Sequence, residues 1–166
     1  MSENPNRTLV CSVLFLDIEG YSKKSVTEEL NLKRQFNAIL TTALSHVATD
    51  DRIVLDTGDG AAVCFLSDPE DSLFAAINVR DAIASIEPGQ TIQMRLRIGI
   101  NIGPVRLLKD INGQVNIIGD GINDAQRVMS LLSLARSWCR APILKLYPGF
   151  PMIIRACSVS EWPIDP

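Results

Sequence analysis

The sequence predicts an α+β fold, a ferredoxin-like βαββαβ sandwich with a largely antiparallel sheet. Apolar runs with strand character alternate with stretches whose apolar residues recur at helical spacing, in the order strand, helix, hairpin, helix, strand, strand, helix. The 166 residues suit one domain with a substantial core and contain no internal repeat. We expect the helices to cover one face of the sheet.

The first half of the chain predicts a strand, a helix and a hairpin. Residues 9–17 form an apolar run typical of a buried strand. Ser25 and Glu28 make a capping-box pattern that opens a helix. Residues 52–66 predict two short strands around a turn at 57–60. The buried face of the helix should consist of Leu32, Phe36, Ile39, Leu40, Ala43 and Val47.

The second half continues with a helix and a series of strands. Asp68 and Pro69 supply an N-cap and an N1 proline for the helix, which should end before Pro88. Its buried residues should be Leu73, Ile77 and Ile83. The remaining expected elements are a half-buried strand at 94–102, a strand at 103–108, a loop at 110–113, a strand at 115–118 and a final helix.

Composition excludes several classes of function. The net charge is −3 and no basic tract is present, so we expect neither nucleic acid nor an anionic membrane as a partner. The apolar runs are too short to span a bilayer and the first residues are polar, which favours a soluble, cytoplasmic protein. His46 is the only histidine, which disfavours a histidine-based triad. The cysteines lack metal-like spacing, and Cys11 and Cys64 should be buried, reduced thiols.

Two aspartates stand where an apolar strand meets a glycine-marked turn. Asp17 ends the first strand before Gly20, and Asp59 lies between Gly58 and Gly60. A carboxylate at the end of a buried strand is unfavourable unless a cation meets it. Two of them could bind a pair of Mg²⁺ or Mn²⁺ ions, which prefer hard oxygen ligands. Each alone has an ordinary interpretation, Asp17 as a helix cap and Asp59 as a turn residue.

The last predicted helix carries two further candidates. Asn123 and Arg127 are one helical turn apart, so they could together hold a ribose and a developing phosphoryl charge. Alone, Asn123 is an ordinary polar helix residue and Arg127 an ordinary surface ion pair. We expect ordinary surface positions for several other charged residues. Asp56 and Asp120 should be solvated loop acids, Glu19 should be exposed, and Arg95 and Arg97 should lie on the outer face of a strand.

Taken together, these segments resemble the class III adenylate/guanylate cyclase catalytic domain. The resemblance runs from about Val10 to Ser130. Any one of the motifs is weak, but four in the right order form a specific signature. They are Phe15-Leu16-Asp17-Ile18-Glu19-Gly20-Tyr21-Ser22, Thr57-Gly58-Asp59-Gly60, Arg97-Ile98-Gly99-Ile100-Asn101-Ile102-Gly103, and Asn123 to Arg127.

The resemblance implies a two-metal site shared by two subunits. It makes Asp17, Asp59 and the carbonyl of Ile18 ligands of two Mg²⁺ or Mn²⁺ ions. The following loop would cradle the triphosphate of ATP or GTP, and Asn123 and Arg127 of a partner subunit would stabilise the transition state. The protein would be a head-to-tail homodimer. The loop residues are Glu19, Gly20, Tyr21 and Ser22.

Two departures concern the base of the nucleotide. Adenylate cyclases usually carry a base-reading lysine four residues before the second metal aspartate, where this chain has Leu55. The partner specificity position, seven residues before the asparagine, is Asn116 rather than Asp or Thr. An apolar Leu55 cannot hydrogen-bond a base edge, so the choice of base stays open.

Three functions remain to be weighed. The first is a nucleotidyl cyclase that forms cAMP or cGMP and pyrophosphate. The second is a catalytically weak or inactive cyclase-like module that dimerises or binds nucleotide in signalling, which Leu55 favours. The third, a domain similar to diguanylate cyclases, is disfavoured. The hairpin reads Gly58-Asp59-Gly60-Ala61 where that class has Gly-Gly-(Asp/Glu)-Glu-Phe.

We expect a cyclase catalytic domain over residues 8–130, and the resemblance stops abruptly at an atypical tail, 131–166. The tail holds both tryptophans and five of the nine prolines, at 142, 148, 151, 163 and 166. A one-base shift of the reading frame from the Ser130 codon onward permits F-A-E-P-G-Q-V-M-V-S, similar to the A-x-P-G-Q-I-L-V-S segment of the family. We therefore interpret the tail as out-of-frame coding, expect it to supply none of the closing strands, and expect the gene's nucleotide sequence to show the shift.

Overall fold

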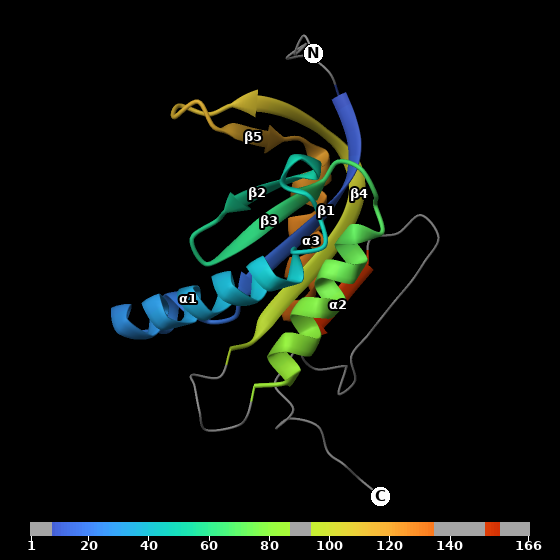
Figure 1. Cartoon of the computed structure of the whole chain (residues 1–166). Coiled ribbons are helices and arrows are strands. Elements are labelled where there is room, and N and C mark those ends of the chain that lie inside the picture. Colours follow the sequence, from blue (N-terminus) through green and yellow to red (C-terminus); the bar gives the residue numbers. More distant parts are fainter. Residues whose placement is uncertain (1–7, 87–93, 135–151, 157–166) are drawn as a thin grey trace, which may run out of the picture.

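The computed structural model describes residues 8–86, 94–134 and 152–156, which form an α+β fold (Figure 1). A six-stranded sheet has the order β2-β3-β1-β4-β5, with β6 also paired to β4, and every pair is antiparallel. The elements are β1 (Thr8–Ile18), η1 (Tyr21–Lys23), α1 (Val26–Ala43), η2 (Thr49–Asp51), β2 (Arg52–Asp56), β3 (Gly60–Phe65), α2 (Asp71–Ala84), β4 (Leu96–Lys109), β5 (Val115–Ile118), α3 (Asp120–Leu134) and β6 (Met152–Ala156).

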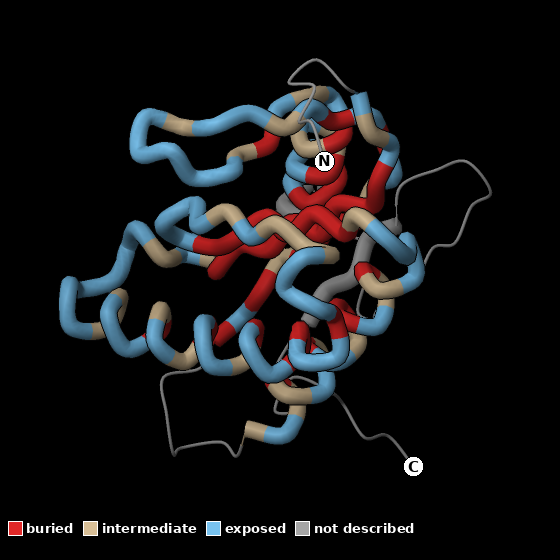
Figure 2. The backbone as a smooth tube through the Cα atoms, turned by 45° about the horizontal axis from the view of Figure 1, so that its top comes forward, coloured by how far each residue is buried: buried red, intermediate tan, exposed pale blue. Residues whose placement is uncertain are grey.

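Strand β1 lies at the centre of the sheet, between β3 and β4, and is buried over most of its length. Its residues from Cys11 to Ile18 are all buried, as the apolar run predicts (Figure 2). Asp17 stands directly opposite Gly60 on one neighbour and Arg97 on the other. The central position of β1 therefore places the first predicted metal ligand between two strands.

The helices cover both faces of the sheet. Alternate β1 residues such as Leu14 and Leu16 pack with α1 and α2 in one core, whereas Val13 and Phe15 pack with α3 in a second core. Gly99 on β4 allows α3 to approach closely, since an added Cβ would lie 2.5 Å from the carbonyl oxygen of Ala125. The expectation that all helices lie on one face is wrong, because α3 lies on the other (Figure 1).

The predicted first helix and hairpin are confirmed. Helix α1 begins after Ser25, whose side chain accepts from the amide of Glu28, while the Glu28 carboxylate accepts from the amide of Ser25. Leu32, Phe36, Leu40 and Ala43 form its buried face, with Ile39 partly buried and Val47 buried beyond the helix end. Cys11 and Cys64 are buried free thiols, as expected.

Three local expectations need correction. Helix α2 begins at Asp71, because Asp68 instead stabilises the turn before it by accepting from the amide of Glu70. Its buried residues are mostly small, namely Ser72, Ala75, Ala76, Val79 and Ile83. The two strands expected at 94–102 and 103–108 are one strand, β4, since Gly103 and Pro104 stay paired with β1. Ile102 near the far end of the half-buried stretch is 58% exposed, whereas Ile98 and Ile100 are buried.

Part of the tail joins the sheet. Helix α3 continues past residue 130 to Leu134, and Met152–Ala156 pair with Leu96–Ile100 as β6. The expectation that the tail supplies no strand is therefore wrong for these residues; the remainder of the tail lies outside the described residues. No helix in the described part of the chain is both long enough and apolar enough to cross a bilayer.

Candidate active site

Asp17 and the turn between β2 and β3 meet at the end of β1. The amide of Ile18 donates to the carbonyl oxygen of Asp59 at 2.9 Å. An added Cβ at Gly60 would lie 2.0 Å from the carbonyl oxygen of Leu16, so only glycine lets the turn approach β1 this closely. The strand pairing thus brings together Asp17, Ile18 and Asp59, which the sequence analysis names as expected metal ligands.

The two carboxylates belong to adjacent backbone segments. Asp17 is buried, whereas Asp59 is exposed, and the negative charge of Asp59 acts on Asp17. Burial raises the pKa of the Asp17 carboxyl above its usual range, hydrogen bonds and charge from Arg97 oppose the rise, and the negative charge of Asp59 adds to it. Two acids held this close repel each other when both are ionised, so the site favours a cation.

A cation from the chain itself already lies against Asp17. Nε of Arg97 donates to Oδ2 of Asp17 at 2.8 Å, and a terminal guanidinium nitrogen donates to the same oxygen. The Arg97 side chain is only 25% exposed. The expectation that Arg97 lies on the outer face of a strand therefore misses its role, because cross-strand pairing points it at a buried carboxylate. Arg97 leaves Oδ1 of Asp17 for another ligand.

The loop after Asp17 turns sharply into the short helix η1. Gly20 makes the turn with φ 73°, a conformation that favours glycine. Glu19 is tied to β4, since its amide donates to the carbonyl oxygen of Arg95 at 2.9 Å and its carboxylate lies 3.7 Å from Nε of Arg95. Glu19 is therefore half-buried rather than exposed as expected. Tyr21 and Ser22 begin η1, and the first amides of a helix lack an intrahelical acceptor.

The predicted base-contacting residues lie on two different strands. Leu55 on β2 is half-buried and packs against the core that α3 covers. Asn116 on β5 stands opposite Leu108, and its Oδ1 accepts from the amide of Ile117 at 2.7 Å. Leu55 therefore presents no polar group, whereas the amide nitrogen of Asn116 is a potential donor.

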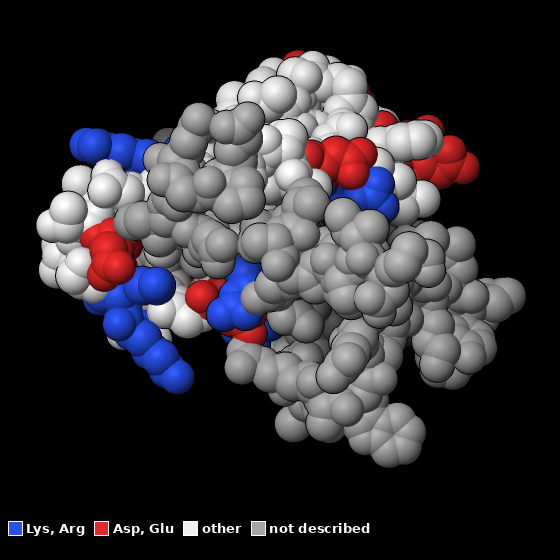
Figure 3. All heavy atoms as spheres, turned by 90° about the horizontal axis from the view of Figure 1, so that it is seen from below, with Lys and Arg blue, Asp and Glu red and all other residues white. Residues whose placement is uncertain are grey.

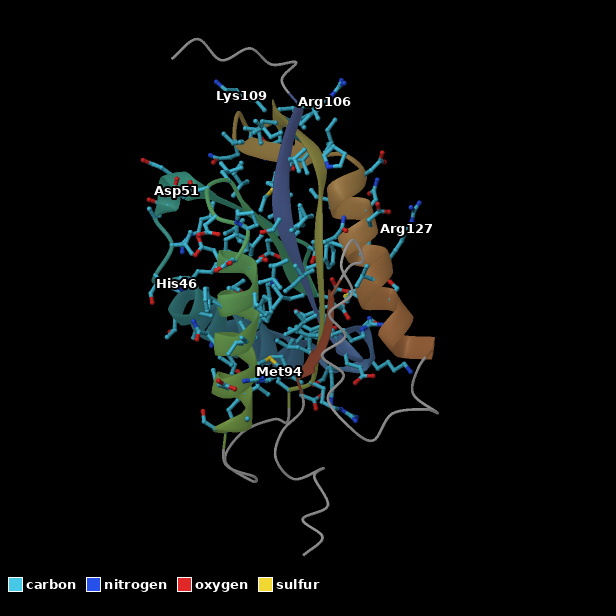
Figure 4. The ribbon with its side chains drawn as sticks, turned by 90° about the vertical axis from the view of Figure 1, so that its right-hand side faces the viewer. His46, Asp51, Met94, Arg106, Lys109 and Arg127 are labelled. Carbon is cyan, nitrogen blue, oxygen red and sulfur yellow. The ribbon has the colours of Figure 1, made fainter. Side chains whose placement is uncertain are left out.

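Asn123 and Arg127 lie on the outer face of α3. The residues of α3 that face the sheet include Ala125, Val128 and Met129, whereas Asn123 and Arg127 are exposed. Arg127 is 78% exposed, pairs with Asp124 of its own helix at 3.0 Å, and points away from the sheet (Figure 4). A helix with its side chains is about 10–12 Å across, so α3 separates this pair from the sheet face beneath it. The structure does not bring the pair to the aspartates within one chain.

Charged side chains of both signs lie on the face drawn in Figure 3. No group of three or more His, Cys, Asp or Glu side chains among the described residues is placed to hold a metal ion. A metal centre at this place would therefore depend on Asp17, Asp59, backbone oxygen and the substrate itself.

Several solved structures of similar architecture are nucleotide cyclase domains. One is the guanylyl cyclase domain of the RhoGC fusion protein from the aquatic fungus Blastocladiella emersonii (TM-score 0.63, 20% identity, 75% of each chain covered). Another is the guanylate cyclase domain of RhGC from Catenaria anguillulae in complex with GTP (TM-score 0.61, 17% identity, 90% of this chain and 95% of that one). A third is an adenylate/guanylate cyclase/hydrolase from Silicibacter pomeroyi (TM-score 0.58, 21% identity, 90% and 95%). No protein-family model and no curated protein matches the sequence.

The chain has the nucleotide cyclase fold. On this fold the two aspartates are adjacent, which fits a divalent cation, since Mg²⁺ typically binds one or two carboxylates together with substrate phosphates. The contact between Arg97 and Asp17 was not predicted from the sequence. The signal available was the need of a buried Asp17 for a cation, but the register that pairs residues 80 positions apart cannot be read from local patterns.

Proposed function

We propose that the chain is a nucleotidyl cyclase domain that converts a nucleoside triphosphate, ATP or GTP, into a cyclic nucleotide and pyrophosphate. The observation that carries the proposal is that the turn bearing Asp59 lies beside Asp17 at the end of a central strand, where the carbonyl oxygen of Asp59 accepts from the amide of Ile18, on a cyclase fold. Solved neighbours with this fold include a domain in complex with GTP. The ribose 3′-oxygen would attack the α-phosphorus and pyrophosphate would leave.

The first half of the site would hold the metal ions and the triphosphate. Asp17, Asp59 and the carbonyl of Ile18 would bind two Mg²⁺ or Mn²⁺ ions, which would lower the pKa of the 3′-hydroxyl and neutralise the leaving group. The backbone of the loop from Glu19 to Ser22 would bind the triphosphate, although the amide of Glu19 itself already donates to the carbonyl oxygen of Arg95. Arg97 would supply a further positive charge next to Asp17, where its fork can donate to phosphate oxygens.

The second half of the site would come from another copy of the chain. Asn123 would orient the ribose and Arg127 would stabilise the charge on the transferred phosphorus. The proposal of a head-to-tail homodimer is supported by their exposed position on α3, away from the aspartates of the same chain. It is also supported by apolar side chains that are more than half exposed on one face of the sheet, namely Val10, Ile102 and Ile118.

A catalytically weak or inactive cyclase-like module is the alternative. The observation that favours it is the packing of Leu55 into an apolar core, which leaves the base without a hydrogen-bonding lysine. Such a module would bind nucleotide or dimerise in signalling without turnover.

We further propose that the cyclase domain ends at residue 130 and that residues 131–166 arise from out-of-frame coding. We place the protein in the cytoplasm, which the buried free thiols of Cys11 and Cys64 support.

Turnover distinguishes the two functions. We expect the chain, assayed with ATP and separately with GTP in Mn²⁺, to release cyclic nucleotide and pyrophosphate in equal amounts from at least one of them. Asp59→Asn is the matched control and should release neither. Binding of Mn²⁺-nucleotide without product would support the alternative, and a chain that neither binds nor converts either nucleotide and does not dimerise would contradict both.

A further inference from the structure

Lys33 on α1 reaches across to the turn that carries Asp59. Its Nζ donates to Oδ1 of Asp56 at 2.7 Å and to the carbonyl oxygen of Gly60 at 2.9 Å. These two acceptors are the last residue of β2 and the first residue of β3, so one ammonium group holds both ends of the turn. Its side chain is only 16% exposed, and Nζ lies 5.2 Å from the centroid of the Phe36 ring.

The contacts made by Lys33 continue into the turn. Oδ1 of Asp56 accepts the hydrogen bond from Lys33 and also accepts one from the amide of Gly58 at 2.7 Å. Partial burial would raise the pKa of Asp56, but hydrogen bonds from Lys33 and Gly58 hold it below the usual range. Gly58 has φ 86°, so this hydrogen bond holds a residue in the left-handed conformation directly before Asp59. The expected solvated acid Asp56 is thus the centre of a small network.

The same turn is in contact with the first aspartate. The carbonyl oxygen of Asp59 accepts from the amide of Ile18, and the backbone of Gly60 packs against Asp17, where an added Cβ would lie 2.9 Å from the Asp17 Cα. A displacement of the turn would therefore move Asp59 relative to Asp17. Mutation of groups that support metal ligands typically lowers metal affinity about 10–100-fold.

We propose that Lys33 is a positioning residue that clamps the β2–β3 turn and so holds Asp59 beside Asp17 before any metal or nucleotide arrives. This inference rests on the proposed function of the two aspartates. An ion pair whose acid is 62% exposed contributes little to global stability, so the clamp should act on the geometry of the turn rather than on folding.

The test compares Lys33→Met with Arg34→Met, which removes a cation from the next, exposed position of the same helix. Lys33→Met should speed amide hydrogen exchange of Ile18 and residues 57–60, and should weaken Mn²⁺-nucleotide binding by about tenfold or more. Its melting temperature should fall by no more than about 4 °C. Arg34→Met should leave exchange and affinity unchanged. Lys33→Arg, which can donate to both acceptors, should restore most of the affinity.

A second variant and the binding of the parent chain distinguish the Lys33 proposal from the cyclase proposal. If Lys33→Met is too unstable to measure, Asp56→Asn removes the same ion pair from the exposed side and should likewise speed exchange of the turn. Faster exchange in Lys33→Met than in the parent chain, with no binding of Mn²⁺-nucleotide by the parent, would support the clamp while contradicting the cyclase site. Unchanged exchange at Ile18 and residues 57–60 in a folded Lys33→Met protein would overturn the clamp, whatever the parent binds.

Discussion

Asp17→Asn and Asp59→Asn should each lower the affinity for Mn²⁺-nucleotide by on the order of a hundredfold, because loss of one partner of a close charge contact costs about 3 kcal/mol. Each substitution removes one of the two carboxylates that lie together at the end of β1. Titration calorimetry with a non-reactive triphosphate analogue and Mn²⁺ measures the change. Unchanged affinity in both folded variants would contradict metal binding at this pair.

The same two substitutions should have opposite effects on the metal-free protein. Asp59→Asn removes a charge that only repels Asp17, so the free energy of unfolding should rise slightly. Asp17→Asn leaves the largely buried Arg97 without its carboxylate, which should lower the free energy of unfolding by about 1–3 kcal/mol. Chemical denaturation without metal measures both values. A lower stability of Asp59→Asn than of Asp17→Asn would show that Arg97 is not the group that stabilises Asp17.

Gly99→Ala should have the largest effect on stability. The added Cβ would lie 2.5 Å from the carbonyl oxygen of Ala125 and 2.7 Å from the amide nitrogen of Met129. Both atoms belong to the backbone of α3, which cannot move aside without separating from the sheet. We expect the free energy of unfolding to fall by about 3 kcal/mol, the upper range for overpacking in a core.

A substitution on the same strand provides the control for Gly99→Ala. Ile102 is 58% exposed, so Ile102→Ala should change the free energy of unfolding by no more than about 0.5 kcal/mol. Urea denaturation of both variants, with equal m-values, measures the difference. Gly99→Ala as stable as Ile102→Ala would mean that α3 does not pack on β4 as closely as described.

Local signals in the sequence predict those elements whose cause is also local. The capping box at Ser25 and Glu28 starts α1 where expected, because both partners lie three residues apart. The turn at 57–60 is equally local, since Gly58 needs a positive φ and Asp56 caps its amide. The strand β1 follows from a continuous apolar run, because a central strand is covered on both faces.

Contacts between distant segments are what the sequence leaves out. The pairing of Asp17 with Arg97 depends on the register between β1 and β4, and the reach of Lys33 to Gly60 depends on where α1 lies on the sheet. Nor does periodicity tell which face of the sheet a helix covers, which is why the position of α3 was predicted wrongly. Periodicity likewise does not predict that Ile102 is exposed, because a strand can extend beyond the helices that cover it.

The residues of the candidate site can be identified from local motifs, but the contacts between them cannot. The motifs identify Asp17, Asp59, Asn123 and Arg127 by residue type and spacing, but only the fold tells which of them meet. The aspartates meet within one chain, whereas Asn123 and Arg127 lie exposed on the outer face of α3. Completion of the site across two subunits is therefore the central claim of the proposed function.

Mixing two inactive variants tests that claim most directly. Asp17→Ala and Arg127→Ala chains should each be inactive alone and should regain activity after subunit exchange, because a mixed dimer contains one site with both Asp17 and Arg127. Equal mixing should restore about a quarter of the parent rate, since half of the dimers are mixed and each has one intact site of two. Mixtures that stay inactive after verified exchange, with an active parent chain, would contradict a site shared between subunits.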